Sequence, residues 1–196
     1  QGEFARGLAH ADNDLVTLPH RGPQLGERAA RVAARPAGHD LAFAQSREVE
    51  APEAQAEGFR RHIAAARKTG LPLEIHTRDA DADTIAILED EHAKGAFPAV
   101  LHCFTGGREL AMRALELGLY VSFSGVITFK KNDALRDIAR EVPLDRLLVE
   151  TDAPFLAPRD VKPRIERNEP RHLRHIAGLV AACRGEAPEA LAAATT

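Results

Sequence analysis

The chain has 196 residues, of which 44% are hydrophobic, 28% are charged and 5% are aromatic. A chain of this length buries a sizeable core as one domain, so any second domain has to be small. Its 26 basic and 29 acidic residues leave a formal net charge of −3, which excludes a globally basic nucleic-acid clamp but not a local basic patch. The two cysteines are too few for a disulfide framework, and no apolar run is long enough to span a membrane. We therefore expect a soluble globular protein from a reducing compartment, the cytoplasm.

Residues 1–51 differ in pattern from the rest of the chain. Large apolar side chains are sparse there, lie among Ala, Arg, Gly and His, and follow neither the helical nor the strand period. We interpret residues 1–51 as an irregular segment in which no strand can be identified. Residues 52–196 are then the part of the chain with a regular pattern.

From Pro52 onward, helices and short apolar strands alternate. In chain order we predict a helix over 52–69 closed by Gly70, a strand over 71–77, a helix over 81–94, a strand over 98–104, a helix over 108–117, a strand over 119–125, a helix over 132–141, a strand over 146–152, a helix over 168–184 and a short helix from Pro188. Short, almost continuously apolar strands separated by helices indicate βαβ units and a parallel sheet covered by helices. The predicted fold class is α/β, with four legible βα units.

Three of the four predicted strands end in a side chain that can bind a metal ion or transfer a proton. These are His76 in EIHT, His102 in VLHC and Asp152 in VETD. Because the carboxyl ends of parallel strands meet at one edge of a sheet, side chains placed there can converge on one point. Two neutral imidazoles and a carboxylate suit a borderline divalent ion such as Zn²⁺ or Mn²⁺. The alternative is that each histidine is a strand-end residue with a satisfied hydrogen bond.

Other titratable residues are weaker signals. Glu150 lies two residues before Asp152 on the same face of its strand, where a carboxylate can orient a metal ligand or form a structural ion pair. We assign the remaining histidines to the solvated surface: His10, His20, His39, His62, His92, His172 and His175.

Several cations and a glycine pair follow the predicted strands. Arg78 comes directly after His76, where a guanidinium can hold a phosphate in a bidentate grip. Four further cations lie in later loops and form either a local basic rim or an ordinary solvated surface: Lys130, Lys131, Arg164 and Arg167. The pair Gly106-Gly107 permits close backbone approach to an anion. No aromatic stacking platform is evident, because Tyr120 and most of the eight phenylalanines lie in or beside apolar segments.

Several short sequence motifs in this part of the chain are also informative. The strings LPLEIHTRDADADT, AVLHCFTGG, YVSFSGVITFK, VPLDRLLVETDAPFLAP and RNEP occur in this order within residues 52–194. Together they closely resemble the TatD family of metal-dependent hydrolases. The resemblance implies a (β/α)₈ TIM barrel of the amidohydrolase type, one or two divalent ions (Zn, Mg or Mn) and phosphodiester hydrolysis, typically of DNA by a 3′ exonuclease.

The same resemblance assigns roles to residues. It implies that His76 and His102 are metal ligands and that Asp152 both binds metal and activates the attacking water as a general base. We expect Arg78, Lys130 and Arg167 to contact a DNA substrate through its backbone, with weak base specificity.

The sequence departs from the family pattern in its first part. The family's His-x-His pair and its glutamate motif are absent, and the stretch PAGHDLAFAQ, which contains Asp40, stands where the glutamate motif is expected. We therefore expect an incomplete barrel in which residues 52–196 form the C-terminal part and supply the last four βα units. Two functions stay open: a metal-dependent deoxyribonuclease, or a non-catalytic TatD-like scaffold or remnant that acts as a binding module.

Overall fold

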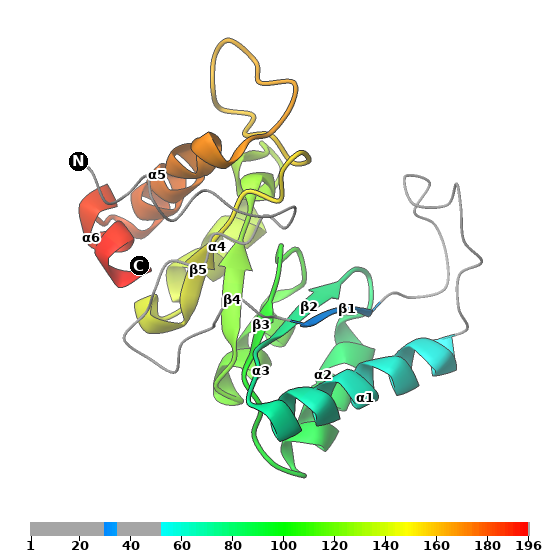
Figure 1. Ribbon diagram of the computed structural model, residues 1–196. Coiled ribbons are helices and arrows are strands. Elements are labelled where there is room, and N and C mark those ends of the chain that lie inside the picture. The colour runs from blue at the N-terminus through cyan, green and yellow to red at the C-terminus, as the bar shows by residue number, and fades with distance from the viewer. Residues whose placement is uncertain (1–29, 35–51, 196) are drawn as a thin grey trace.

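The computed structural model describes residues 30–34 and 52–195, with side chains described over 52–195 (Figure 1). The strands are β1 (Ala30–Ala34), β2 (Leu73–Thr77), β3 (Ala99–Leu101), β4 (Tyr120–Phe123) and β5 (Leu147–Val149). The α-helices are α1 (Pro52–Thr69), α2 (Asp81–His92), α3 (Arg108–Glu116), α4 (Asp133–Glu141), α5 (Leu173–Arg184) and α6 (Pro188–Ala194). Three 3₁₀ turns complete the elements: η1 (Gly125–Thr128), η2 (Leu144–Arg146) and η3 (Pro170–His172).

The five strands form one sheet, and their order in the sheet is their order in the chain. Each neighbouring pair is parallel, from β1 on β2 through to β4 on β5. The prediction of an α/β fold with a parallel sheet is therefore confirmed. Because all five strands run the same way, their carboxyl ends and the loops that follow them share one edge of the sheet.

Strand β1 lies within the segment that we interpreted as irregular because no strand could be identified there from the sequence. Its sequence ARVAA contains a single β-branched residue, Val32, so its intrinsic preference for a strand is weak. The strand forms by pairing, with Ala30 opposite Leu73 and Ala34 opposite Thr77 along the full length of β2. Such pairing is a long-range interaction that a local pattern cannot reveal.

The two faces of the sheet differ in character. One face packs under the helices through alternate strand residues, among them Leu73, Ile75, Leu101, Val121 and Leu147, all of which are fully buried. The intervening residues point to the other face. They include a small apolar cluster of Val100, Tyr120 and Leu148, and beyond it, toward the carboxyl edge, polar side chains.

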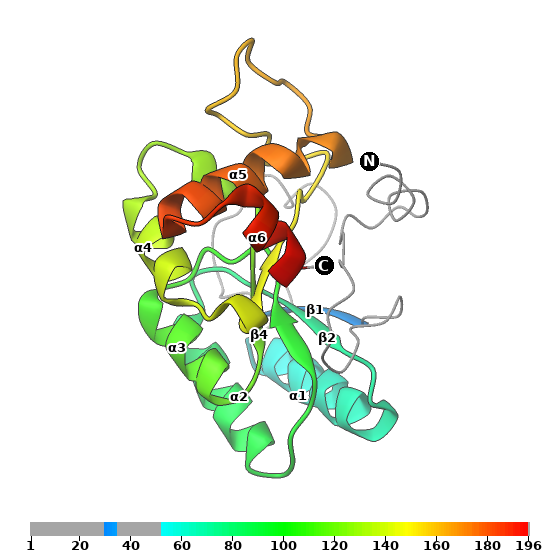
Figure 2. The same ribbon diagram turned by 90° about the vertical axis from the view of Figure 1, so that its left-hand side faces the viewer.

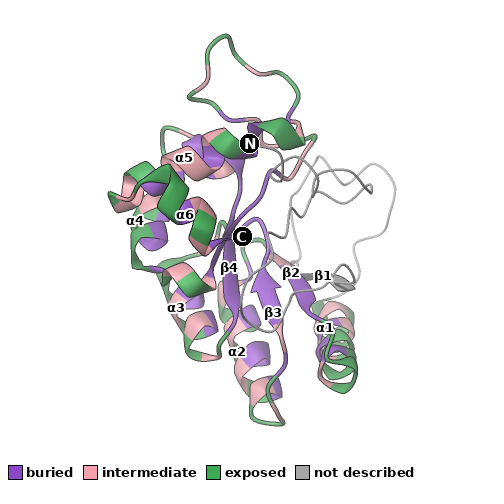
Figure 3. Ribbon diagram, turned by 60° about the vertical axis from the view of Figure 1, so that its left-hand side comes forward, coloured by how far each residue is buried: buried purple, intermediate pink, exposed green. Residues whose placement is uncertain are grey.

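The helices follow one another around the sheet. Consecutive helices from α1 to α6 contact each other in turn. Figure 2 shows α1 to α5 as an arc outside the strands, and Figure 3 shows β2, β3 and β4 as buried, beside helices that carry exposed residues. Among the described residues, no helix combines the length and apolar character that a membrane span needs.

A buried carboxylate joins α1 to α2 at the end of the molecule away from the strands' carboxyl edge. Glu91 is 3% exposed and accepts hydrogen bonds from Arg60 (3.1 Å), Arg67 (3.2 Å) and Lys94 (2.6 Å). Arg67 also donates to the carbonyl of Gly95 at 2.9 Å. Burial raises the pKa of Glu91, but the hydrogen bonds from Lys94, Arg60 and Arg67 outweigh it, so the pKa lies below its ordinary value of 4.5.

We expect Glu91→Gln to lower the free energy of unfolding at pH 7 by about 1 to 2 kcal/mol, because it removes charge-assisted hydrogen bonds. A carboxyl whose pKa is lowered by folding stabilises the protein above its unfolded pKa, and this contribution is lost as the pH falls through the folded value. The difference between the native chain and the variant should therefore shrink below about pH 4.5. Urea unfolding at several pH values measures it, and Glu57→Gln, in an exposed pair with Arg61, should cost less than about 0.5 kcal/mol.

Candidate functional site

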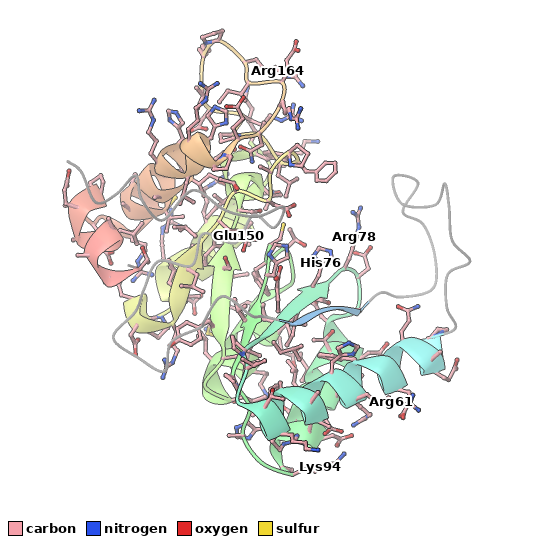
Figure 4. All side chains as sticks on the ribbon, in the orientation of Figure 1. Arg61, His76, Arg78, Lys94, Glu150 and Arg164 are labelled. Atoms are coloured by element: carbon pink, nitrogen blue, oxygen red, sulfur yellow. The ribbon has the colours of Figure 1, made fainter. Side chains whose placement is uncertain are left out.

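The residues predicted at the strand ends come together at the carboxyl edge of the sheet. His76 lies in β2, His102 directly follows β3, and Asp152 lies three residues beyond β5. The ring centroids of His76 and His102 are 5.9 Å apart, and Nε2 of His102 is 3.4 Å from Oδ1 of Asp152. Figure 4 labels His76, Arg78 and Glu150 toward this edge, whereas Arg61 and Lys94 lie at the far end of the molecule on α1 and after α2.

Buried carboxylates orient the His102 ring. Its Nδ1 donates to Oε2 of Glu150 at 3.0 Å and lies 3.1 Å from Oε1 of Glu74. Ser122 donates a second hydrogen bond to the same Glu150 oxygen at 2.7 Å, and both Ser122 and Glu150 are fully buried. With Nδ1 engaged in this way, the other nitrogen, Nε2, faces Asp152.

The site carries an excess of negative charge around one imidazole. Burial lowers the pKa of His102, but the hydrogen bonds to Asp152 and Glu150 and the nearby charge of Glu74 outweigh it and raise the pKa to about 10. Three carboxylates, Glu74 in β2 and Glu150 and Asp152 after β5, therefore lie around a single buried ring, and their field favours a positive charge at this point.

Strand-end backbone geometry aims these residues. Asp79, Cys103 and Asp152 have positive φ angles of 51°, 47° and 56°, and each lies within three residues of the end of β2, β3 or β5. Non-glycine residues in this region are uncommon and concentrate at functional sites. The turn of the chain at these residues also ends β3 and β5 earlier than we predicted from the apolar pattern.

Cys103 links two of these turns. Its Sγ is 3.2 Å from Oγ of Ser124 and 3.7 Å from Oδ2 of Asp152. Burial, and after it the charges of Glu150 and Asp152, raises the pKa of the Cys103 thiol well above its ordinary range. The side chain is consequently a neutral, buried thiol beside Asp152 rather than a nucleophile.

Part of the donor set has the spacing of metal ligands. Two ligand atoms bound tetrahedrally at about 2.1 Å from one zinc ion are about 3.4 Å apart, which is the separation of His102 Nε2 and Asp152 Oδ1. A metal-binding histidine also usually donates its other N–H to a carboxylate, as Nδ1 does to Glu150. Within residues 30–34 and 52–195, however, no group of three or more potential ligands converges closely enough to hold an ion. The donor chemistry of His102 and Asp152 thus fits part of the coordination of a divalent ion. Asp40, the one acidic residue considered in the earlier stretch, lies outside the described residues.

The predicted substrate-binding cations are all exposed, on separate loops. Arg78 follows β2 and lies 3.9 Å from Asp79, Lys130 follows η1, and Arg167 lies in the long segment between β5 and η3. Arg164 lies in the same segment, which Figure 4 shows projecting beyond α5. The Gly107 amide, in contrast, already donates to Oδ2 of Asp81 at 2.6 Å. The expected approach of that glycine backbone to an anion is therefore replaced by an internal hydrogen bond.

Two predictions about other side chains were wrong. His172, which we placed on the solvated surface, is buried: its Nδ1 accepts the Glu169 N–H at 3.1 Å, and burial lowers its pKa. Beside it, buried Asn168 donates to the carbonyl of Thr151 at 2.7 Å and so holds the chain next to Asp152. An aromatic side chain is also exposed near the site, because Phe155 is 62% exposed three residues after Asp152.

Sequence reasoning also missed Glu74, Ser122 and Cys103. A signal existed for the first of these, because a charged residue in the middle of a buried strand needs a partner. The spacing Glu74-x-His76 repeats that of Glu150-x-Asp152, so each strand places a buried carboxylate just inside a strand-end residue.

Comparisons with known proteins agree with this geometry. A sequence profile of the family described as TatD related DNase matches residues 27–196, which includes β1 and so begins upstream of residue 52. The chain is 51% identical over 142 residues to "Uncharacterized metal-dependent hydrolase YcfH" of Escherichia coli (strain K12), covering 72% of this chain and 52% of that protein. It is 42% identical over 154 residues to "3'-5' ssDNA/RNA exonuclease TatD" of Citrobacter koseri, covering 76% and 58%.

Solved structures show the same fold. The crystal structure of YJJV, a TatD homologue from Escherichia coli K12, matches with a TM-score of 0.67 and 24% identity over 84% of this chain and 58% of that one. A TatD family hydrolase from Entamoeba histolytica matches with a TM-score of 0.63 and 21% identity over 73% and 54%. The predicted TIM-barrel-like class is therefore confirmed, and the chain spans about half the length of the curated relatives it matches. This chain belongs to the family of TatD related DNases.

Proposed function

We propose that this chain acts as a metal-dependent phosphodiester hydrolase on nucleic acid, and that His76, His102 and Asp152 contribute ligands to its divalent ion. The observation that carries the proposal is the facing pair of His102 Nε2 and Asp152 Oδ1 at 3.4 Å. The ring of that pair is fixed from behind by Glu150. The names of similar proteins, a metal-dependent hydrolase and an ssDNA/RNA exonuclease, support the same reaction class.

Each residue has a defined task in this proposal. A divalent ion, when bound, supplies Lewis acidity and lowers the pKa of water. Asp152, half-buried at the edge, accepts the proton of the attacking water as general base. Arg78, Lys130 and Arg167 offset phosphate charge from the loops, so the backbone rather than the base sequence is recognised. The metal is Zn, Mg or Mn, with one or two ions per site. Nucleotides are removed one after another from the 3′ end of the strand.

A second function is favoured by one observation. Within the described part of the chain, no three potential ligands converge to hold an ion. A chain that bound metal weakly would act as a non-catalytic scaffold or binding module of the TatD type. The two functions differ in one property, which is hydrolysis that depends on added metal.

The test uses single-stranded DNA and RNA oligonucleotides labelled at the 5′ end. We expect Mg²⁺, Mn²⁺ or Zn²⁺ to support stepwise shortening from the 3′ end, EDTA to stop it, and excess metal to restore it. Shortening that persists in EDTA would refute the metal-dependent mechanism. Intact oligonucleotides with every metal would favour the scaffold.

Glu150→Gln should weaken metal binding without removing a ligand. The amide keeps the size of the side chain but replaces the charged acceptor of the His102 N–H, and such partners of metal-bound histidines typically contribute 10- to 100-fold in affinity or activity. We therefore expect the metal concentration needed for half-maximal cleavage to rise by about 10- to 100-fold. Glu89→Gln, which alters an exposed pair with Arg113, should leave this concentration unchanged.

A further inference from the structure

We propose that Phe155 is a stacking platform for a nucleobase of the substrate strand next to the scissile phosphate. The inference rests on the proposed function, because it names a contact that the same site makes with nucleic acid. It starts from exposure: among the described large apolar side chains, only Phe155 and Leu71 are exposed, at 62% and 41%. An exposed phenyl forgoes the free energy that its burial would gain.

The backbone places Phe155 beside the carboxylate assigned as general base. Its N–H donates to the carbonyl of Asp152 at 2.9 Å, so the two residues close one tight turn at the carboxyl edge of the sheet. Leu71 lies at the opposite edge, just before β2 begins at Leu73. Of the two exposed apolar side chains, only Phe155 is therefore at the edge that holds His76, His102 and Asp152.

The chain that follows Phe155 is anchored at two points. The carbonyl oxygen of Leu156 packs so closely on Gly125 that a methyl group there would come within 1.8 Å of it. Three residues further on, Arg159 donates its N–H to Thr128 at 2.8 Å and lays its guanidinium over the ring of Phe129 at 5.0 Å. A phenyl on such a fixed backbone loses little conformational freedom when a base stacks on it.

The charges of the loop between β5 and η3 do not by themselves make it a nucleic-acid binding surface. Its exposed charged side chains are four cations and two acids: Arg159, Asp160, Lys162, Arg164, Glu166 and Arg167. A loop of mixed charge gives weak, non-directional attraction to phosphate, whereas an aromatic face stacks on any base. The structure therefore assigns recognition of the base to Phe155 and leaves the phosphate to the residues of the edge.

The experiment uses fluorescence, because the chain contains no tryptophan. Phe155→Trp and the control Leu71→Trp each introduce one indole, at opposite edges of the sheet. The probes are a nuclease-resistant phosphorothioate oligothymidylate and an abasic phosphorothioate oligomer of the same length. We expect the oligothymidylate, and not the abasic strand, to quench the indole of Phe155→Trp, and neither strand to quench that of Leu71→Trp.

The affinity of the chain for each strand is a second, independent readout. It is measured by fluorescence anisotropy of the labelled strand. Phe155→Ala should bind oligothymidylate about 5- to 100-fold more weakly and the abasic strand equally well, and Phe155→Tyr should restore binding. Native affinity in Phe155→Ala, or equal quenching by both strands, would overturn the stacking role while leaving the proposed hydrolase intact. A native chain that binds no oligonucleotide would overturn both proposals.

Discussion

Replacing His102 with alanine should reduce metal-dependent cleavage of single-stranded DNA by about a thousandfold or more. The ring faces Asp152, and Glu150 and Glu74 contact its other nitrogen, with Glu150 in turn held by Ser122. Losing a ligand forfeits several kcal/mol of charge stabilisation in the transition state, and each 1.4 kcal/mol or so is tenfold in rate. Initial rates at saturating metal measure the effect.

Two further variants separate catalysis from folding. Asp152→Asn keeps the shape of a half-buried side chain and should lose activity with little change in thermal stability. His62→Ala removes an exposed histidine on α1 whose Nδ1 interacts with the Gly58 carbonyl, and should retain native rates. Full activity in both His102→Ala and Asp152→Asn would show that this edge is not the site of hydrolysis.

Gly125→Ala should destabilise the chain by about 2 kcal/mol or more, although it adds a single methyl group. The new Cβ would lie 1.8 Å from the carbonyl oxygen of Leu156, which is backbone and cannot rotate away. The loop that carries Asp152 and Phe155 would have to move off η1. We therefore expect a fall in melting temperature of several degrees, together with lost activity, in calorimetry and in the cleavage assay.

Gly58→Ala provides the matched control with the opposite sign. Gly58 lies within α1, and nothing is within 4 Å of the position that a methyl group would take. Alanine there should raise the free energy of unfolding by about 0.5 to 1 kcal/mol, because glycine loses more backbone entropy in a helix. Equal effects of the two substitutions would mean that the close contact at Gly125 does not constrain the loop.

The sequence predicts those parts of the fold that depend on local pattern. Helix α1 forms over Pro52–Thr69 as expected, because its apolar stripe of Phe59, Ile63 and Ala66 meets the core and Gly70 ends it with φ of 70°. Strand β1 is different, because ARVAA has little strand preference and exists through its pairing with β2. Local sequence pattern therefore predicts helix α1 but cannot predict strand β1.

Some residues of the candidate site could likewise be predicted from the sequence, and others could not. His76, His102 and Asp152 could be named because strand ends are visible in the pattern and parallel strands share an edge. The contact between Glu74 and His102 depends on the register of β2 against β3, which sequence spacing does not give. Phe155 is part of an apolar string in the sequence, and only the turn back to Asp152 leaves it exposed.

Hydrogen bonds between buried polar groups explain why the prediction for His172 was wrong. His172 carries no mark in the sequence that separates it from His175 one turn away. It is buried beside Asn168, which accepts the Glu169 N–H and donates to the Thr151 carbonyl. A buried neutral histidine of this kind needs a local donor, and the Glu169 N–H provides one. The loop between β5 and η3 is therefore held by residues outside the set that we propose to bind substrate or metal.

Equilibrium metal binding tests the central claim most directly. The purified chain, stripped with chelator, is dialysed against Zn²⁺ or Mn²⁺ beside Asp152→Asn, His102→Ala and the control His62→Ala, and bound metal is counted by mass spectrometry. We expect at least one ion per native chain and per His62→Ala chain, and metal affinity at least tenfold lower in the other two variants. Equal metal content in all four proteins, or none in the native chain, would contradict the central claim.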